Sequence, residues 1–437
     1  MTSSQPLEGG DLNAKTPSGF AEILSHRLQN LRQQIRHDPL RNPVRELAHE
    51  LSRHLQANDI SLSSFHALID FLDKEAFARR ADHINHYVKT SDNEENSPIK
   101  SVVETLSAEL TNIDDFRQFW QARRETIIFT GHPTFILSQQ ARKRLAEAAT
   151  ERAVPSQGAG MPDSPLTLDH EHSQAEESLR HASEALFTLN REILNLAKSR
   201  FPGEWLSVKP EPLGLGTWVG YDMDGRTDIG WASVIRHRLE EKRNRLRLYI
   251  ERLGAVENDV APIKAELEKA LNAVEQHYLA FSKDLKTPED LAHASNLLTT
   301  DQHNITSLKT IINQLMVAAG DAKGATAVEI AAIVAEMRIF GLGMGDIHFR
   351  LNAAQIRNSA RGILGLSRDA DLFGRSALED ISTHIENAKP LHVNFGSLAI
   401  EQSSSARLFI AMAQILKHID ADSSRRLLIA ECENAVT

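Results

Sequence analysis

Helical periodicity runs through most of the chain, and it restricts the fold more than any other feature. Leu24, Leu28 and Leu31 recur at steps of four and three residues, which places them on one face of a helix. Residues 1–17 are polar and predict a loose tail before this pattern begins. Further helices are predicted over residues 43–55, 63–88, 137–149, 176–199, 232–253, 261–285, 288–298, 305–317, 325–335, 353–364 and 403–434.

Three segments interrupt the helical pattern, and all three have the same order of parts. They cover residues 126–134, 213–226 and 337–350. Each begins with a run typical of a buried strand, continues with polar or ionisable residues, and precedes a helix. The sequence therefore predicts a mainly α protein with α/β elements.

Repeated βα units favour a β/α barrel, in which the carboxyl ends of the strands face one common mouth. Such a barrel would bring together His132, Asp222, Asp224 and Arg350. An arginine after an apolar strand suits an anion, because its guanidinium pairs with carboxylate or phosphate in a bidentate manner. Two plainer interpretations stay open: a tight acidic turn for the aspartates and an ordinary surface arginine.

Two charged segments carry weaker signals. The helix over residues 236–252 is rich in arginine, but its interleaved glutamates predict a solvent-exposed helix face rather than a nucleic-acid site. The run Asp169–His172 lacks the HExxH spacing, and its alternating residues do not share a helix face, so no metal site is predicted there.

Composition narrows the function classes. The net charge of −10 and a pI near 6.0 speak against nucleic-acid and membrane partners. The single cysteine, Cys432, excludes an internal disulfide and a CxxC site. Without a signal peptide or a long apolar run, the chain is predicted to be a cytoplasmic, soluble protein.

The three interrupting segments resemble the motifs of one enzyme family. Residues 129–135 (FTGHPTF) resemble the FTAHPTE motif of phosphoenolpyruvate carboxylases. Residues 216–225 (GTWVGYDMDG) resemble that family's SWxGGDRDGNP segment, and residues 340–350 (FGLGMGDIHFR) resemble FGxxLxxLDIRQES. The motifs occur in the family's order, and weaker likeness covers residues 18–437.

This resemblance implies a helix-rich partial TIM (β/α) barrel, usually in a homo-oligomer, and a carbon–carbon lyase. The family's reaction joins phosphoenolpyruvate and bicarbonate to give oxaloacetate and phosphate, and it requires Mg²⁺ or Mn²⁺. This carbon-fixing reaction supplies oxaloacetate to the tricarboxylic acid cycle. By motif position, His132 matches the catalytic histidine, Arg350 and Trp218 match substrate-binding residues, and Asp222 and Asp224 are possible pocket residues.

The sequence also departs from the family. Phe135, Met223 and Leu351 stand where the motifs carry charged or polar residues. Family enzymes are longer, and their metal carboxylates and HGRGG loop lie in a C-terminal half that this sequence lacks. The chain is thus expected to contain no metal ligands and to need a partner or continuation. The alternative is a non-catalytic helical partner or regulatory homologue.

Overall fold

The computed structural model divides the chain into two compact units, residues 1–92 with 135–164 and residues 93–134 with 165–437. It describes residues 16–34, 38, 41–87, 98–130, 137–151, 153–155, 157–161, 167–224, 226, 228–256, 260–390, 392–422 and 425–432. Most of the tail predicted over residues 1–17 lies outside this description. The division into two units was not predicted.

The smaller unit is purely helical in its described part. It consists of α1 (Pro17–Gln34), α2 (Pro43–Gln56), α3 (Leu62–Tyr87) and α6 (Gln139–Glu151). One cluster of buried apolar side chains joins α1 to the start of α3 through Phe20 and Leu68. A second joins α3 to α6 through Phe77, Ala81 and Leu145. Each helix buries one apolar stripe, as its periodicity predicts.

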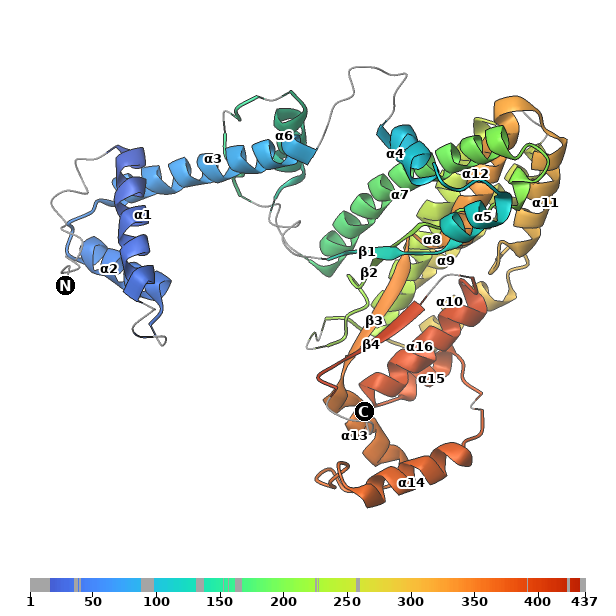
Figure 1. Cartoon of the computed structure of the whole chain (residues 1–437). Helices are drawn as coiled ribbons and strands as arrows, with labels where there is room; N and C mark the ends of the chain where they lie inside the picture. Colours follow the sequence, from blue (N-terminus) through green and yellow to red (C-terminus); the bar gives the residue numbers. More distant parts are fainter. Residues whose placement is uncertain are drawn as a thin grey trace. The chain divides into compact units, whose positions relative to one another are not determined.

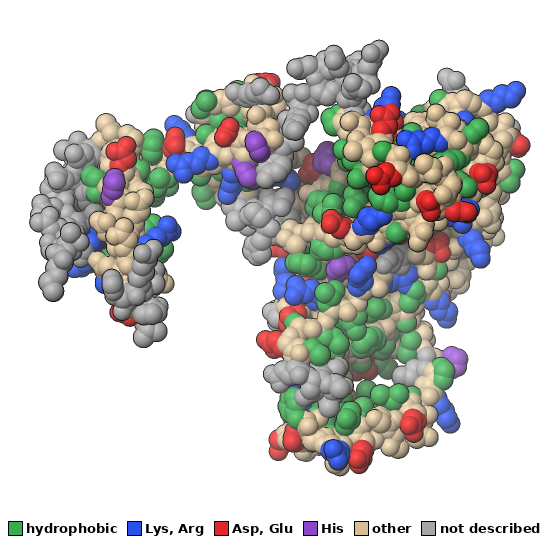
Figure 2. All heavy atoms as spheres, viewed as in Figure 1, with side chains coloured by type: hydrophobic (Ala, Val, Ile, Leu, Met, Phe, Trp, Pro, Cys, Tyr) green, Lys and Arg blue, Asp and Glu red, His purple; other side chains and the backbone are tan. Residues whose placement is uncertain are grey.

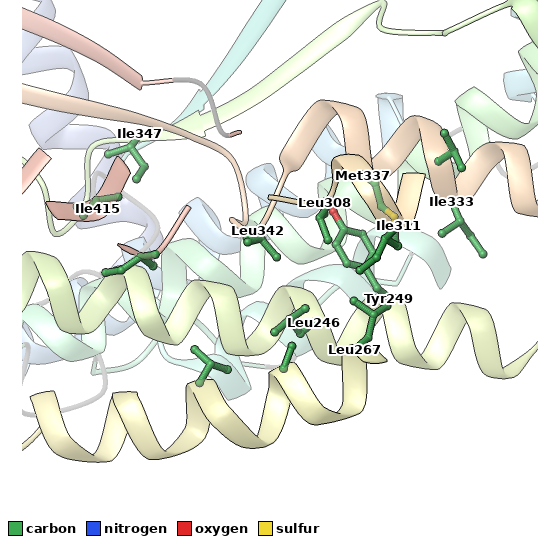
Figure 3. Close-up of a cluster of buried hydrophobic side chains, with 14 of the residues drawn as sticks. Leu246, Tyr249, Leu267, Leu308, Ile311, Ile333, Met337, Leu342, Ile347 and Ile415 are labelled. Carbon is green, nitrogen blue, oxygen red and sulfur yellow. The ribbon is translucent and has the colours of Figure 1, made fainter. Parts of the chain in front are cut away.

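The larger unit holds a layered helical core beside a small sheet (Figure 1). Its helices are α4 (Pro98–Leu106), α5 (Ile113–Gln121), α7 (Leu168–Arg200), α8 (Trp231–Gly254), α9 (Ala261–Phe281), α10 (Pro288–Thr300), α11 (Lys309–Asp321), α12 (Gly324–Phe340), α13 (Ala353–Ile363), α14 (Arg375–Glu386), α15 (Phe395–Ile400) and α16 (Ser404–His418). Leu246, Leu267, Ile311 and Met337 lie in the core of this unit (Figure 3).

The sheet has four strands that follow one another in chain order. These are β1 (Glu125–Phe129), β2 (Leu213–Thr217), β3 (Asp346–Asn352) and β4 (Arg425–Ala430). The order is β1-β2-β3-β4, and every neighbouring pair is parallel. Parallel strands require crossover connections, and the helices between the strands provide them.

The two faces of the sheet differ in chemistry. Ile347, Phe349 and Leu351 point from β3 into the helical core, where all three are buried. Asp346 and His348 alternate with them and therefore point to the opposite face. Their face is polar, and it is also the face from which Arg350 projects.

Three expectations about the elements were wrong. Residues 337–340 belong to α12 rather than to a strand, and β3 begins only at Asp346. The C-terminal segment expected to be helical contains β4. Helix α7 begins at Leu168, where the Thr167 side chain caps it by accepting from the His170 N–H, well before the expected start.

Burial decreases towards the C-terminus. Figure 2 shows hydrophobic side chains gathered on the surface formed by the C-terminal elements. Ile363, Phe373, Ile385 and Ile400 are among the exposed ones. Within the described residues, no helix combines the length and hydrophobicity that crossing a lipid bilayer requires.

The close packing of β2 against β3 generates a prediction about Gly216. A Cβ atom at this position would lie 2.9 Å from the carbonyl oxygen of Asp346, which belongs to the neighbouring strand's backbone. Gly216→Ala should therefore lower the free energy of unfolding by about 1–3 kcal/mol in urea titrations. Gly203→Ala is the matched control, because no heavy atom lies within 4 Å of its added carbon. Equal effects at the two glycines would contradict this packing.

Candidate functional site

The segment after β2 pairs with the end of β3. The Arg350 N–H donates to the Tyr221 carbonyl at 3.3 Å, and the Met223 N–H donates to the Arg350 carbonyl at 3.1 Å. Asp222 and Arg350 thus form a parallel bridge beyond the last residue of β2. This pairing extends the sheet by one position and fixes residues 218–224 at the carboxyl ends of the strands.

Three of the residues predicted to form a site meet there. Arg350 Nη1 lies 3.2 Å from Asp222 Oδ2, and the guanidinium carbon lies 4.9 Å from the centre of the Trp218 ring. An aromatic face beside a guanidinium gives a cation–π contact and holds the side chain in place. The Arg350 side chain is 30% exposed, so a small anion can reach it.

The side chains of the two remaining predicted residues are not part of this contact. Asp224 is joined to the site through its backbone, because its N–H donates to Asp222 Oδ1 at 3.1 Å. His132 lies outside the described residues. The structure therefore brings Trp218, Asp222 and Arg350 together.

The polar face of β3 adds two groups that the sequence analysis did not select. Arg123 Nη1 lies 2.7 Å from Asp346 Oδ2, and the Asp346 side chain is 3% exposed. His348 Nε2 is buried without a hydrogen-bond partner in the described structure. Burial lowers the pKa of His348, and the charge of Arg426 on β4 lowers it further. His348 is therefore a neutral imidazole at pH 7.

Behind this site lies a buried polar network. The Tyr221 hydroxyl donates to Glu241 Oε1 at 2.5 Å, and His172 Nε2 lies 3.2 Å from the same oxygen. Glu241 Oε2 accepts from Arg238 at 2.5 Å, and Arg238 also pairs with Asp420. Burial alone would raise the pKa of Glu241, but Arg238 and the two hydrogen bonds lower it to about 2.

The expectation of a solvent-exposed face on α8 is confirmed for Arg247 and Glu251 but is wrong for three basic residues. Arg238, Lys242 and Arg245 are each at most 1% exposed. Lys242 Nζ donates to three oxygen atoms, those of the Asn304 side chain and of two backbone carbonyls. Arg245 Nη1 lies 3.0 Å from Glu336 Oε1. These basic side chains belong to the core because acceptors from other elements surround them, and burial lowers the pKa of Lys242 to about 7.

Two histidines stack within the network. The rings of His172 and His237 are 4.0 Å apart and nearly parallel. Burial, followed by the charge of His172, lowers the pKa of His237 to about 3. His237 Nε2 contacts Asp169, whose pKa falls to about 2, chiefly because Arg236 donates to it. His237 is therefore neutral at pH 7.

The divalent ion implied by the resemblance does not fit the strand-end site. Asp222 is already engaged by Arg350, and its second oxygen accepts from a backbone N–H. Over the described ranges, one group of His, Cys, Asp and Glu has ligand atoms mutually within 4.8 Å: His172, Glu176 and Glu240. We therefore derive no catalytic step through Mg²⁺ or Mn²⁺.

No protein-family model matches the chain, and no curated protein is detectably similar to it.

The buried network predicts an acid-dependent contribution from Tyr221. Tyr221→Phe removes a hydrogen bond to a charged carboxylate and should cost about 1.5–3 kcal/mol of unfolding free energy at pH 7. Glu241 has a folded-state pKa of about 2, below its ordinary 4.5. Stability that depends on this carboxylate is therefore complete above pH 4.5 and decreases as the pH falls towards 2.

Urea titrations of the unaltered chain and of Tyr221→Phe at pH 7 and at pH 3 measure this effect. The difference between the two proteins should be smaller at pH 3. A difference that stays constant between the two pH values would mean that Tyr221 does not act through the charge on Glu241.

Proposed function

We propose that this chain carries the phosphoenolpyruvate-binding part of a phosphoenolpyruvate carboxylase-like protein. The observation that carries the proposal is the meeting of Trp218, Asp222 and Arg350 at the strand ends. These residues come from two motifs more than a hundred positions apart in the sequence. Their convergence is what a shared substrate pocket requires, and it is independent of the likeness of the motifs themselves.

The sheet supports a partial (β/α) barrel as part of this proposal. Its strands follow in chain order without the reversal that marks a doubly wound sheet. One face is apolar and covered by helices, whereas the other carries Asp346, His348 and Arg350. A barrel has such an arrangement, with helices outside and the functional side chains at the carboxyl ends.

The described residues suit the binding of a small anion. The guanidinium of Arg350 has five N–H donors, of which Asp222 contacts one nitrogen, so a carboxylate or phosphate group can approach the others. Trp218 limits the movement of the guanidinium. Asp222 holds it in the absence of substrate and keeps the buried part of the cation paired.

The proposed reaction is that of the family. Bicarbonate attacks the phosphoryl group of phosphoenolpyruvate, which gives carboxyphosphate and an enolate. Carboxyphosphate then releases CO₂ and phosphate, and the enolate captures the CO₂ to form oxaloacetate. His132 is the residue proposed to assist carboxyphosphate breakdown, and Arg350 neutralises negative charge on the substrate. The Mg²⁺ or Mn²⁺ ligands would come from a C-terminal half or another subunit. Cytoplasmic carbon fixation is part of the same proposal.

One observation favours the second candidate, a non-catalytic partner or regulatory homologue. Met223 and Leu351 occupy positions where the family motifs carry polar or charged residues, and both side chains belong to the hydrophobic core. The site therefore has fewer charged groups for substrate than the motif would provide. A partner protein could keep this fold without the carboxylase chemistry.

Phosphoenolpyruvate binding distinguishes the two candidates at Arg350. We expect phosphoenolpyruvate to change the fluorescence of Trp218, which lies beside the guanidinium. Arg350→Ala should weaken binding by about tenfold or more, because a charge-assisted hydrogen bond is lost. Arg191→Ala is the control, since this partly exposed arginine of α7 pairs with Glu329 instead. Absence of binding at millimolar phosphoenolpyruvate in the unaltered chain would favour the non-catalytic candidate.

Carboxylation itself tests His132. Any oxaloacetate formation from phosphoenolpyruvate and bicarbonate, measured by coupling to malate dehydrogenase with Mg²⁺ present, should fall by about 10²–10⁴-fold in His132→Ala. Substrate binding should change much less than turnover. Unaltered turnover in the variant would remove His132 from the mechanism.

A further inference from the structure

We propose that His172, Glu176 and Glu240 bind a divalent transition-metal ion, with Zn²⁺ as the committed ion. His172 and Glu176 are four residues apart and therefore lie on one face of α7, while Glu240 comes from α8. Their ligand atoms all lie within 4.8 Å of one another. An ion there would link the two long helices that flank the segment after β2.

The orientation of His172 is the first argument for a ligand. Glu241 is a carboxylate and only accepts hydrogen bonds, so the imidazole carries its hydrogen on Nε2, which lies 3.2 Å from Glu241. Nδ1 is buried with no hydrogen-bond partner in the described structure, so an ion that displaces its proton gains an imidazole ligand there. The residue is 2% exposed, so solvent does not satisfy this atom.

The Nδ1 atom faces the carboxylates of the group. His172 Nδ1 lies 3.9 Å from Glu240 Oε2, while the other oxygen of Glu240 faces Arg243. A tetrahedral ion bound at about 2.1 Å holds its ligand atoms roughly 3.4 Å apart. The Glu240 side chain is partly exposed, so a small rotation can close the remaining half ångström.

Glu176 supplies the second argument, because it is buried and its hydrogen-bond partner among the described residues is a neutral amide rather than a lysine or arginine. It is 9% exposed, and Asn244, a neutral donor, contacts its Oε1 at 2.7 Å. Burying a carboxylate without a cation is unfavourable. A divalent ion shared by Glu176, Glu240 and His172 would displace the protons held at the site and balance the two carboxylates.

The pairing of His172 with Glu241 also matches the surroundings of known metal sites. A metal-bound histidine usually donates its other N–H to a carboxylate, which fixes the ring and makes it a better ligand. Glu241 occupies that position and is itself held by Arg238 and Tyr221. The ring therefore does not need to rearrange when an ion binds.

An ion can reach the group from solvent. A cavity of about 300 Å³ opens beside α7 and α8, and Glu176, Asn244 and Leu248 are among the residues that line it. One nitrogen and two oxygen ligands suit Zn²⁺, which accepts both in four-coordinate geometry. Mg²⁺ prefers oxygen ligands alone and should bind far more weakly.

Calorimetric titration of the full chain, stripped of metal by a chelator, tests the proposal with ZnCl₂ as the probe. We expect one high-affinity site per chain and an upward shift of Tm on Zn²⁺ addition. Glu176→Gln should weaken that site by about 100-fold or more and abolish the Tm shift. Glu177→Gln is the matched control, an adjacent glutamate outside the ligand group, and should behave like the unaltered chain.

A second ligand variant and a comparison with Mg²⁺ complete the test. Glu240→Gln removes a ligand from the more exposed position, so it tests the site even if Glu176→Gln does not fold. Equal Zn²⁺ affinity in the unaltered chain and in both ligand variants would overturn the proposal, as would the absence of stoichiometric binding. Mg²⁺ binding as tight as that of Zn²⁺ would overturn the role given to His172. None of these readouts depends on carboxylation.

Discussion

The buried basic side chains of α8 are the constraint on which the rest of the larger unit depends. Arg238, Lys242 and Arg245 follow one another at helical spacing and are removed from water. A buried charge that loses its partner costs several kcal/mol, so the acceptors must be present together. They come from α8, α12, the loop after α10, the loop before β3 and the end of α16. The network therefore ties distant parts of the chain to one helix.

This network explains the need for Gly343, and the backbone of β2 explains the need for Gly345, without any role of either glycine in chemistry. A Cβ atom at Gly343 would lie 2.0 Å from a guanidinium nitrogen of Arg238, and one at Gly345 would lie 2.8 Å from the Leu215 carbonyl oxygen. The same network reaches the candidate site, because Tyr221 donates to Glu241 while the next residue, Asp222, pairs with Arg350. The segment that contains Tyr221 and Asp222 therefore belongs both to the buried network and to the strand-end site.

Local patterns predicted what local forces determine. Helical periodicity located most helices, and the β-branched run of residues 126–129 located β1. Sequence patterns gave a wrong expectation where partners distant in the sequence determine burial. The charges of α8 were expected to be exposed because Asp420, which pairs with Arg238, is 182 positions away. Strand β4 follows closely after α16, and its pairing in register with β3 is what distinguishes it from a continued helix. The sequence analysis did not select His172 and Glu176 as a pair. Their spacing of four residues nevertheless places both on one face of a helix.

The charges at the strand ends limit which anions the candidate site can bind tightly. Phosphoenolpyruvate carries a carboxylate and a phosphate of about −1.5 to −2 charge. Arg350 supplies one positive charge, and Asp222 offsets it, whereas Met223 adds none. An anion of that charge needs further cations within a few ångströms, because the attraction weakens quickly with distance in water. Arg426, which pairs in register with His348, is a further cation on the same face of the sheet, and tight binding of phosphoenolpyruvate requires it or positive groups of another segment or subunit to reach the anion.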